Sequence, residues 1–238
     1  MAISITPVYV ADLLVDLPDV HMDVWVHVIE HPQGRILVDT GLLESHPLAA
    51  DMEPKPAPLN EQDFDIGSIT AVVNTHLHFD HCGGNVLFAG TPTYVQRREL
   101  EDARTIDGYT PREWVDAPGV TYVEVDGELE LVPGVRLVPA PSHTPGSQLV
   151  VVAGEDGAGP TVLAGDNVVF HGDLDEPRTD AQRLIRSLNP GLVWFAHSAE
   201  PWRPPRPLGL WEGKVDIHHD FDDPLPEVEA SLHKPLDP

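Results

Sequence analysis

Four potential metal ligands occur close together in the run HLHFDH at residues 76–81. The run directly follows a stretch of apolar and β-branched residues, which predicts a strand buried on both faces. In extended backbone, residues two apart share a face, so His76 and His78 can converge on one ion. The turn that follows then directs Asp80 and His81 toward a second point nearby. The spacing therefore predicts a metal site at the end of this strand.

Three more potential ligands each lie just after a predicted strand. His143 stands before Thr-Pro-Gly, Asp166 follows Leu-Ala-Gly, and His197 follows Val-Trp-Phe-Ala. The ends of strands are where α/β proteins build their sites. Imidazole and carboxylate ligands without a thiolate suit zinc, with manganese, cobalt or iron as alternatives. We therefore expect divalent metal ions to be the cofactor.

These motifs, taken in order, resemble the metallo-β-lactamase superfamily. The resemblance covers residues 24–197 and rests on five motifs: LVDTG at 37–41, HLHFDH at 76–81, HTPG at 143–146, GD at 165–166 and AH at 196–197. Within the superfamily, the chain resembles the N-acyl-homoserine lactone lactonases, which quench bacterial quorum sensing. This second resemblance rests on HFDH followed by GGN, on YVQRRE at 94–99 and on DGELELVPGV at 126–135.

The resemblance implies an α/β fold in the form of an αββα sandwich, with the site at one edge of the paired sheets. It also implies two divalent ions bridged by Asp166, with the ligands His76, His78 and His143 for one ion, and Asp80, His81 and His197 for the other. Asp39 has two interpretations: it orients a ligand imidazole, or it forms the turn before Thr40 and Gly41.

From this resemblance we predict a dinuclear metallohydrolase that opens the lactone ring of N-acyl-homoserine lactones or related lactones. Metal binding lowers the pKa of water from about 15.7 toward about 7, so a hydroxide that bridges two ions can act as nucleophile at neutral pH. Our hypothesis is that this hydroxide attacks a carbonyl polarised by one ion, while the other ion stabilises the leaving alkoxide. Asp80 would carry the proton from the attacking hydroxide to the leaving alkoxide.

Two positions depart from the lactonase pattern. The lactonases carry a tyrosine three residues after the bridging aspartate, placed to hydrogen-bond the substrate carbonyl, and this chain has Val169 there. We predict that Asn167, His171 or Tyr109 supplies the missing donor, or that the metals alone suffice. The second departure is Ser147, which stands where the lactonases tend to have a histidine.

Two alternative functions stay open at this point. A thioesterase of the glyoxalase II or polyketide-pathway kind would use the same fold and the same metal centre. The segment after His197 is too short and too rich in proline for the helical domain that glyoxalase II adds. A non-catalytic metal-binding protein would bind the two ions and hydrolyse nothing.

The charge of the chain excludes several partners. The 238 residues contain 39 acidic and 14 basic side chains, which gives a formal net charge of -25. No stretch concentrates Lys and Arg enough to bind a phosphate backbone, so we expect no nucleic-acid partner. Between Lys55 and Lys214 there is no lysine, which excludes a central Walker-type loop and a central Schiff-base lysine. A neutral lactone or ester fits such a chain better.

The amino-terminal segment and the cysteine content indicate a compartment. Residues 1–20 contain no Lys or Arg and three Asp, which argues against a signal peptide. No apolar run approaches the roughly 20 residues of a membrane helix. Cys82 is the single cysteine, so an internal disulfide is impossible, as is usual in a reducing compartment. We expect a cytoplasmic protein with no membrane partner.

Short runs rich in Val and Ile between turn signals predict the order of elements. We expect strands at residues 24–30, 34–39, 69–75, 120–125, 129–139, 148–153, 161–165 and 192–196. We expect helices at 96–104 and 179–188. Residues 1–198 should form the hydrolase domain. The proline-rich residues 199–238 should form an extension or arm, which could serve as an exchange arm in a homodimer.

Overall fold

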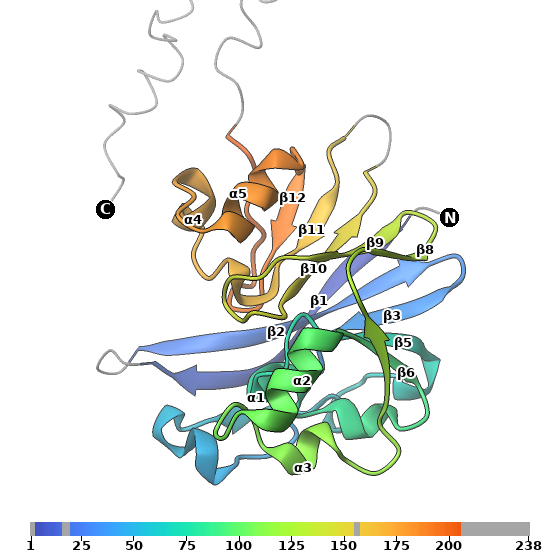
Figure 1. The fold of residues 1–238 in the computed structure, drawn as a ribbon, viewed down its shortest axis with the longest axis vertical. Coiled ribbons are helices and arrows are strands. Elements are labelled where there is room, and N and C mark those ends of the chain that lie inside the picture. Colours follow the sequence, from blue (N-terminus) through green and yellow to red (C-terminus); the bar gives the residue numbers. More distant parts are fainter. Residues whose placement is uncertain (1–2, 16–19, 155–157, 206–238) are drawn as a thin grey trace, which may run out of the picture. The chain divides into compact units, whose positions relative to one another are not determined.

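A computed structural model describes residues 3–15, 20–154 and 158–205 of the chain. In this part, two β-sheets lie face to face and helices cover their outer faces (Figure 1). The layers are therefore helix, sheet, sheet and helix, which confirms the predicted αββα sandwich. All of these elements belong to one compact unit, Met1–Pro204.

The first sheet has the strand order β4-β1-β2-β3-β5-β6-β7. Its strands are β1 (Ser4–Leu14), β2 (His21–His31), β3 (Gly34–Val38), β4 (Lys55–Pro56), β5 (Ile69–Val73), β6 (Pro92–Gln96) and β7 (Thr121–Val125). The second sheet has the order β12-β11-β10-β9-β8. Its strands are β8 (Leu129–Val132), β9 (Val135–Pro139), β10 (Gln148–Val152), β11 (Thr161–Leu163) and β12 (Leu192–Trp194).

The helices are short and lie in the connections. The α-helices are α1 (Phe79–Cys82), α2 (Arg97–Thr105), α3 (Arg112–Val115), α4 (Gly172–Asp175) and α5 (Asp180–Ser187). Short 3-10 segments are η1 (Pro47–Met52), η2 (Leu59–Glu61), η3 (Ile66–Ser68), η4 (Asn85–Phe88) and η5 (Gly165–Asn167). None of the helices in the described ranges combines the length and the apolar character that crossing a membrane requires.

The main core lies between the two sheets, because alternate side chains of both sheets point inward and meet there. Ile29, Ile36 and Val38 of the first sheet belong to the same buried cluster as Leu137 and Val150 of the second. All five residues of β10 are buried, which agrees with its continuous apolar sequence. A further cluster fills the space between the second sheet and helices α4 and α5.

The strand directions bring several strand ends to one edge of the sandwich. Strands β3, β5, β6 and β7 are parallel neighbours, and β11 and β12 are a second parallel pair. Parallel strands end at the same edge, so the residues after β3, β5, β11 and β12 can come together. The backbone N–H of Gln148 donates to the carbonyl of Thr75 at 2.9 Å and joins the two sheets at this edge.

The structure confirms most of the predicted elements and corrects one. The predicted strand 129–139 is in fact two strands, β8 and β9, because the chain turns at Pro133 and Gly134. Gly134 has a φ of +83°, which favours glycine, and a Pro-Gly pair is typical of such a turn. Helix α5 begins with the expected cap, since Thr179 and Gln182 form a reciprocal capping box. Strands β1, β4 and β6 were not predicted.

The predicted carboxy-terminal extension lies mostly outside the described residues, so its boundary and its role stay predictions. Within the described part, Trp202 pairs with Val193 of β12 through two backbone hydrogen bonds of 2.8 and 2.9 Å. Its side chain is buried in the cluster beneath α5.

Candidate metal centre

The seven predicted ligands lie on loops at the edge where the strand ends meet. The HLHFDH run follows β5, and its last residues form α1. His143 lies on the loop that leads into β10, Asp166 lies in η5 after β11, and His197 follows β12. Their side-chain nitrogen and oxygen atoms form two groups, and within each group all ligand atoms lie within 4.8 Å of one another.

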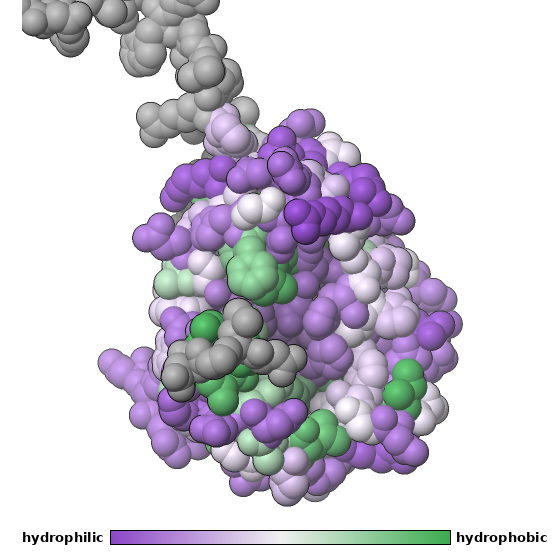
Figure 2. All heavy atoms as spheres, turned by 90° about the vertical axis from the view of Figure 1, so that its left-hand side faces the viewer, coloured by the Kyte–Doolittle hydropathy of each residue, from purple (hydrophilic) through white to green (hydrophobic). Residues whose placement is uncertain are grey.

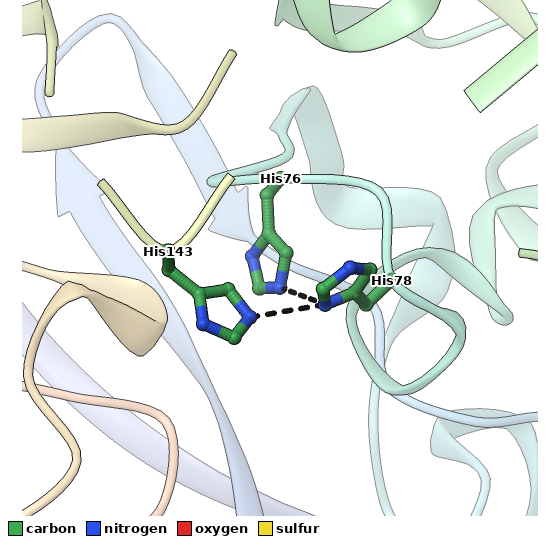
Figure 3. A group of neighbouring side chains, drawn as sticks. All are labelled: His76, His78 and His143. Carbon is green, nitrogen blue, oxygen red and sulfur yellow. Dashed lines mark hydrogen bonds between the residues drawn. The ribbon is translucent and has the colours of Figure 1, made fainter. Parts of the chain in front are cut away.

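The first ligand group consists of His76, His78 and His143, whose rings converge from two loops (Figure 3). His78 Nδ1 lies 3.2 Å from His76 Nε2 and 3.0 Å from His143 Nε2. Nitrogens about 2.0–2.1 Å from a tetrahedral zinc ion are about 3.3 Å apart, so these separations suit a common ion. The burial of the three residues falls from His76, which is buried, to His143, which is exposed.

The second ligand group consists of Asp80, His81, Asp166 and His197. His81 Nε2 lies 3.2 Å from Asp166 Oδ1, and His197 Nε2 lies 3.1 Å from the same oxygen. Asp80 Oδ2 lies 3.4 Å from His81 Nε2. Two imidazoles and two carboxylates around one point are a donor set that divalent zinc, manganese, cobalt or iron can use.

Asp166 connects the two groups, because each of its carboxylate oxygens faces a different one. Oδ1 faces His81 and His197 of the second group, as described above. Oδ2 lies 3.8 Å from His76 Nε2 and 3.5 Å from His143 Nε2 of the first group. This is the placement that a carboxylate shared by two ions requires.

Unsatisfied polar atoms at the centre show that the residues fit bound cations. His81 Nε2 and Asp166 Oδ1 are buried and have no hydrogen-bond partner. A buried polar atom without a partner costs about 1–3 kcal/mol, so such atoms normally have one. A cation held by the second group would satisfy both atoms at once, and we conclude that the donor set suits divalent ions.

Asp39 orients the imidazole of His81 from the loop after β3. His81 Nδ1 donates to Asp39 Oδ2 at 2.9 Å, which leaves Nε2 to face the centre. The backbone N–H and the hydroxyl of Thr75 also donate to Asp39, each at 2.7 Å. Asp39 has a φ of +61°, in the left-handed region. Both interpretations of this residue therefore apply, since it forms the turn and orients the imidazole.

Charge and burial set opposite protonation states in the two groups. Burial lowers the pKa of His76 well below its ordinary value, and burial together with His143 lowers the pKa of His78 to about 4. Burial also acts to lower the pKa of His81, but the carboxylates around it, Asp166 foremost, raise it well above 6.5. His197 has a raised pKa for the same reason. Without metal, His76 and His78 are therefore neutral, whereas His81 and His197 hold protons.

Comparison with known proteins agrees with this geometry. A family model described as the metallo-beta-lactamase superfamily matches residues 21–207. The chain belongs to the metallo-beta-lactamase superfamily. The resemblance drawn from its motifs is thereby confirmed.

Several relatives of this chain are named N-acyl homoserine lactonases. The chain is 35% identical over 223 residues to an N-acyl homoserine lactonase of Bacillus sp, covering 80% of this chain and 85% of that protein. It is 32% identical over 214 residues to the N-acyl homoserine lactonase AiiA of Bacillus thuringiensis subsp. kurstaki, covering 76% and 83%.

Solved structures with the same fold include lactonases. A quorum-quenching N-acyl homoserine lactone lactonase superimposes with a TM-score of 0.66 at 25% identity, covering 83% of this chain and 92% of the other. AidC, a dizinc quorum-quenching lactonase, superimposes with a TM-score of 0.59 at 13% identity, covering 79% and 81%. At that identity, the likeness to AidC concerns the fold alone.

Metal binding to this superfamily member should release protons from the second ligand group. Because His81 and His197 hold protons in the metal-free protein, a cation must displace them, and the apparent affinity should rise with pH above the ordinary histidine value of 6.5. We expect roughly one to two protons per chain at pH 7. Calorimetric zinc titrations in two buffers with different ionisation enthalpies would count them, and a count of zero would contradict these protonation states.

The three candidates for the missing carbonyl donor lie around the ligand groups and belong to neither. The Asn167 side-chain oxygen accepts from the backbone N–H of His143 and from the Ser147 hydroxyl, both at 3.3 Å. The Tyr109 hydroxyl donates to Glu99. His171 is exposed, and its Nε2 lies 3.3 Å from the Ser198 hydroxyl. A donor role for Asn167, His171 or Tyr109 stays a prediction.

Sequence reasoning did not identify the residues that hold the ligand loops in place. Thr75 binds Asp39, as described above, and Thr144 donates its hydroxyl to Glu99 at 2.7 Å. A signal for Glu99 was available, because it stands in the predicted helix next to Leu100 and four residues before Ala103, and both of these are buried. A charged residue in an apolar helical series is rare unless its charge has partners.

Proposed function

We propose that this chain is a dinuclear metal-dependent hydrolase that opens the lactone ring of N-acyl homoserine lactones or related lactones, and so quenches quorum signals. The pair of ligand groups joined by Asp166 is the observation that carries the proposal. The relatives that are named N-acyl homoserine lactonases support the substrate class.

The cofactor that we propose is a pair of zinc ions, with manganese, cobalt or iron as alternatives. The first ligand group would hold one ion, the second group the other, and Asp166 both. When bound, such a pair supplies a polarised carbonyl and water whose pKa is lowered toward about 7. The remaining tasks, which are orientation and proton transfer, belong to side chains of the protein.

Asp80 is the residue that we propose moves the proton. Hydrolysis adds water to the carbonyl carbon, breaks the ring C–O bond and leaves a proton on the new alcohol oxygen. Burial acts to raise the pKa of Asp80, but its proximity to His81 holds that pKa below the ordinary value, so the side chain starts as a carboxylate. A carboxylate at this position can accept the proton of water and pass it to the leaving oxygen.

An apolar pocket beside His197 offers room for the acyl chain of the substrate. Its volume is about 720 Å³, and its lining includes Val15, Val20, Met22, Val169, Phe170 and His197. Hydrophobic side chains gather on this face of the molecule (Figure 2). Val169, at the position of the missing tyrosine, is part of the wall. The loss of a phenol at this position therefore makes the pocket more apolar.

Phe170 should determine how well long acyl chains bind. Its side chain is 69% exposed in the protein alone, so an acyl chain against it would remove apolar surface from water. We expect Phe170→Ala to raise the KM for substrates with long acyl chains by about 10-fold and to leave substrates with short chains nearly unchanged. Ile106→Ala, at an exposed apolar residue outside the pocket, is the matched control. Equal effects on short and long chains would contradict this role.

A substrate panel tests the proposed function. The zinc-loaded protein would be incubated with acyl-homoserine lactones, simple lactones, acyl-thioesters, penicillins and phosphodiesters, and mass spectrometry would detect the addition of water. We expect lactone opening that disappears in His78→Ala. Selective cleavage of thioesters would identify a thioesterase of the same fold instead. Two bound ions without hydrolysis of any substrate would indicate a metal-binding protein.

We also propose a cytoplasmic location. Cys82, the single cysteine of the chain, is buried and free, and burial raises the pKa of its thiol to about 12. A thiol in this state is a packing residue that needs no oxidising compartment. The homodimer considered from the sequence stays a prediction.

A further inference from the structure

We infer that Glu99 is a positioning residue that holds both loops of the first ligand group, His76, His78 and His143, in place. Glu99 lies in α2, outside the seven ligands, and its side chain is fully buried. The inference rests on the proposed metal centre and goes beyond it, because it assigns the geometry of one ion site to a carboxylate that contacts neither ion.

Hydrogen bonds connect Glu99 to the two loops that carry the first ligand group. Its Oε1 accepts from the backbone N–H of Leu77 at 2.8 Å, and Leu77 lies between His76 and His78. Its Oε2 accepts from the hydroxyl of Thr144 at 2.7 Å, and Thr144 follows His143 directly. The loop with Leu77 follows β5 of the first sheet, and the loop with Thr144 connects β9 and β10 of the second sheet. A single carboxylate therefore fixes the distance between them.

Glu99 also reaches His78 through Tyr109. The Tyr109 hydroxyl donates to Glu99 Oε1, and the Tyr109 ring packs against the His78 ring with 5.1 Å between the centroids. His78 is thus held on two sides, by the backbone of Leu77 and by the ring of Tyr109. Both contacts end at the same carboxylate.

The loop after His143 packs directly on α2 at Glu99. A Cβ added to Gly146 would collide with the backbone of Glu99, so only glycine allows this approach. The arginines beside Glu99 are bound elsewhere, since Arg98 pairs with Asp102 and Arg97 pairs with Glu124. Within the described part of the chain, Glu99 forms no ion pair. Its carboxylate therefore functions as an acceptor of three hydrogen bonds.

Each ligand group thus has its own buried carboxylate behind it. Asp39 holds the imidazole of His81 directly, and Glu99 holds the loops of the first group through their backbone and through Thr144. Groups that orient metal ligands from behind typically contribute 10–100-fold to metal affinity or activity. We expect Glu99 to contribute to the affinity for the ion of the first group and not to the affinity for the other ion.

Glutamine at position 99 tests the inference. Glu99→Gln removes the negative charge and turns one acceptor into an amide donor, which would either face the backbone N–H of Leu77 or force the Thr144 hydroxyl to accept instead of donate. We expect zinc competition with a chelator to show one of the two ions bound about 10–100-fold more weakly and the other unchanged. The same ion should be lost in His78→Ala, which identifies the first group. Glu101→Gln, at an exposed position of the same helix, is the matched control and should bind both ions normally.

A matched pair at position 144 keeps the test valid if Glu99→Gln fails to fold. Thr144→Val keeps the shape of the side chain and removes the donor. We expect it to lower the affinity for the ion of the first group several-fold. Thr144→Ser keeps the donor, so affinity should stay within about twofold of the wild type. Equal behaviour of the two variants would overturn the inference.

Stability measurements separate positioning from general support of the fold. The inference is wrong if Glu99→Gln lowers the melting temperature of the metal-free protein but leaves both zinc affinities unchanged. It is also wrong if the variant lowers the affinity for both ions equally. These affinities need no substrate. A wild-type chain that binds two ions but opens no lactone would therefore refute the proposed function, while the result for Glu99 would still stand.

Discussion

Asp166→Asn is expected to lower the rate of lactone opening by about 10³-fold. Each oxygen of Asp166 faces a different ligand group, at 3.1–3.2 Å for Oδ1 and 3.5–3.8 Å for Oδ2. Asparagine keeps the shape of the side chain but replaces one oxygen with an amide nitrogen, which is no metal ligand, and removes the negative charge. Groups that only orient ligands contribute 10–100-fold, so a shared ligand should contribute more.

The pKa of Asp166 shows why the charge matters at this position. Burial acts to raise this pKa, but the imidazoles of His81 and His197 lower it well below the ordinary value, so the side chain is a carboxylate at neutral pH. Asp166→Asn removes that charge from the point where two cations are to be held. We expect the variant to retain at most one ion per chain at stoichiometric zinc.

Metal content per chain and initial rates would be measured together for Asp166→Asn. Asp63→Asn, at an exposed position, is the control for the loss of one negative charge and should match the wild type in both measurements. Full retention of both ions together with full activity in Asp166→Asn would contradict the assignment of Asp166 as the shared ligand.

The convergence of the seven candidate ligands could be predicted from the sequence, because they lie where the backbone pattern changes. Each one follows a short apolar strand, and the ends of neighbouring parallel strands meet at one edge of a sheet. Strands such as β5 and β10 were evident because continuous Val and Ile runs indicate burial on both faces. Pairing of the two sheets then brings His143 and Asp166 to the same point as the HLHFDH run.

Other features could not be predicted, because they depend on contacts between distant segments. Nothing local in the sequence shows that Leu77 and Thr144, 67 positions apart, share the carboxylate of Glu99. Strand β1 has weaker alternation than its neighbours, and its pairing with β2 decides its structure. The apolar pocket is also a tertiary feature, since Val15 and Phe170 come from different layers of the sandwich.

Asp39→Asn separates the two interpretations of Asp39. Asparagine tolerates the left-handed φ of +61°, so the turn before Thr40 should be preserved. The three donors on Asp39, from His81 Nδ1 and from the N–H and hydroxyl of Thr75, would instead meet one oxygen and one amide group. At least one of them would lose its acceptor in a buried environment.

We therefore expect Asp39→Asn to lower the affinity for the ion of the second ligand group by about 10–100-fold. The metal-free protein should also lose about 1–3 kcal/mol of stability, because at least one buried donor would have no acceptor. Chelator competition and urea unfolding measure the two effects. Glu53→Asn is the control, since Glu53 is exposed and also has a left-handed φ, of +40°. Unchanged affinity in Asp39→Asn would mean that Asp39 serves the turn alone.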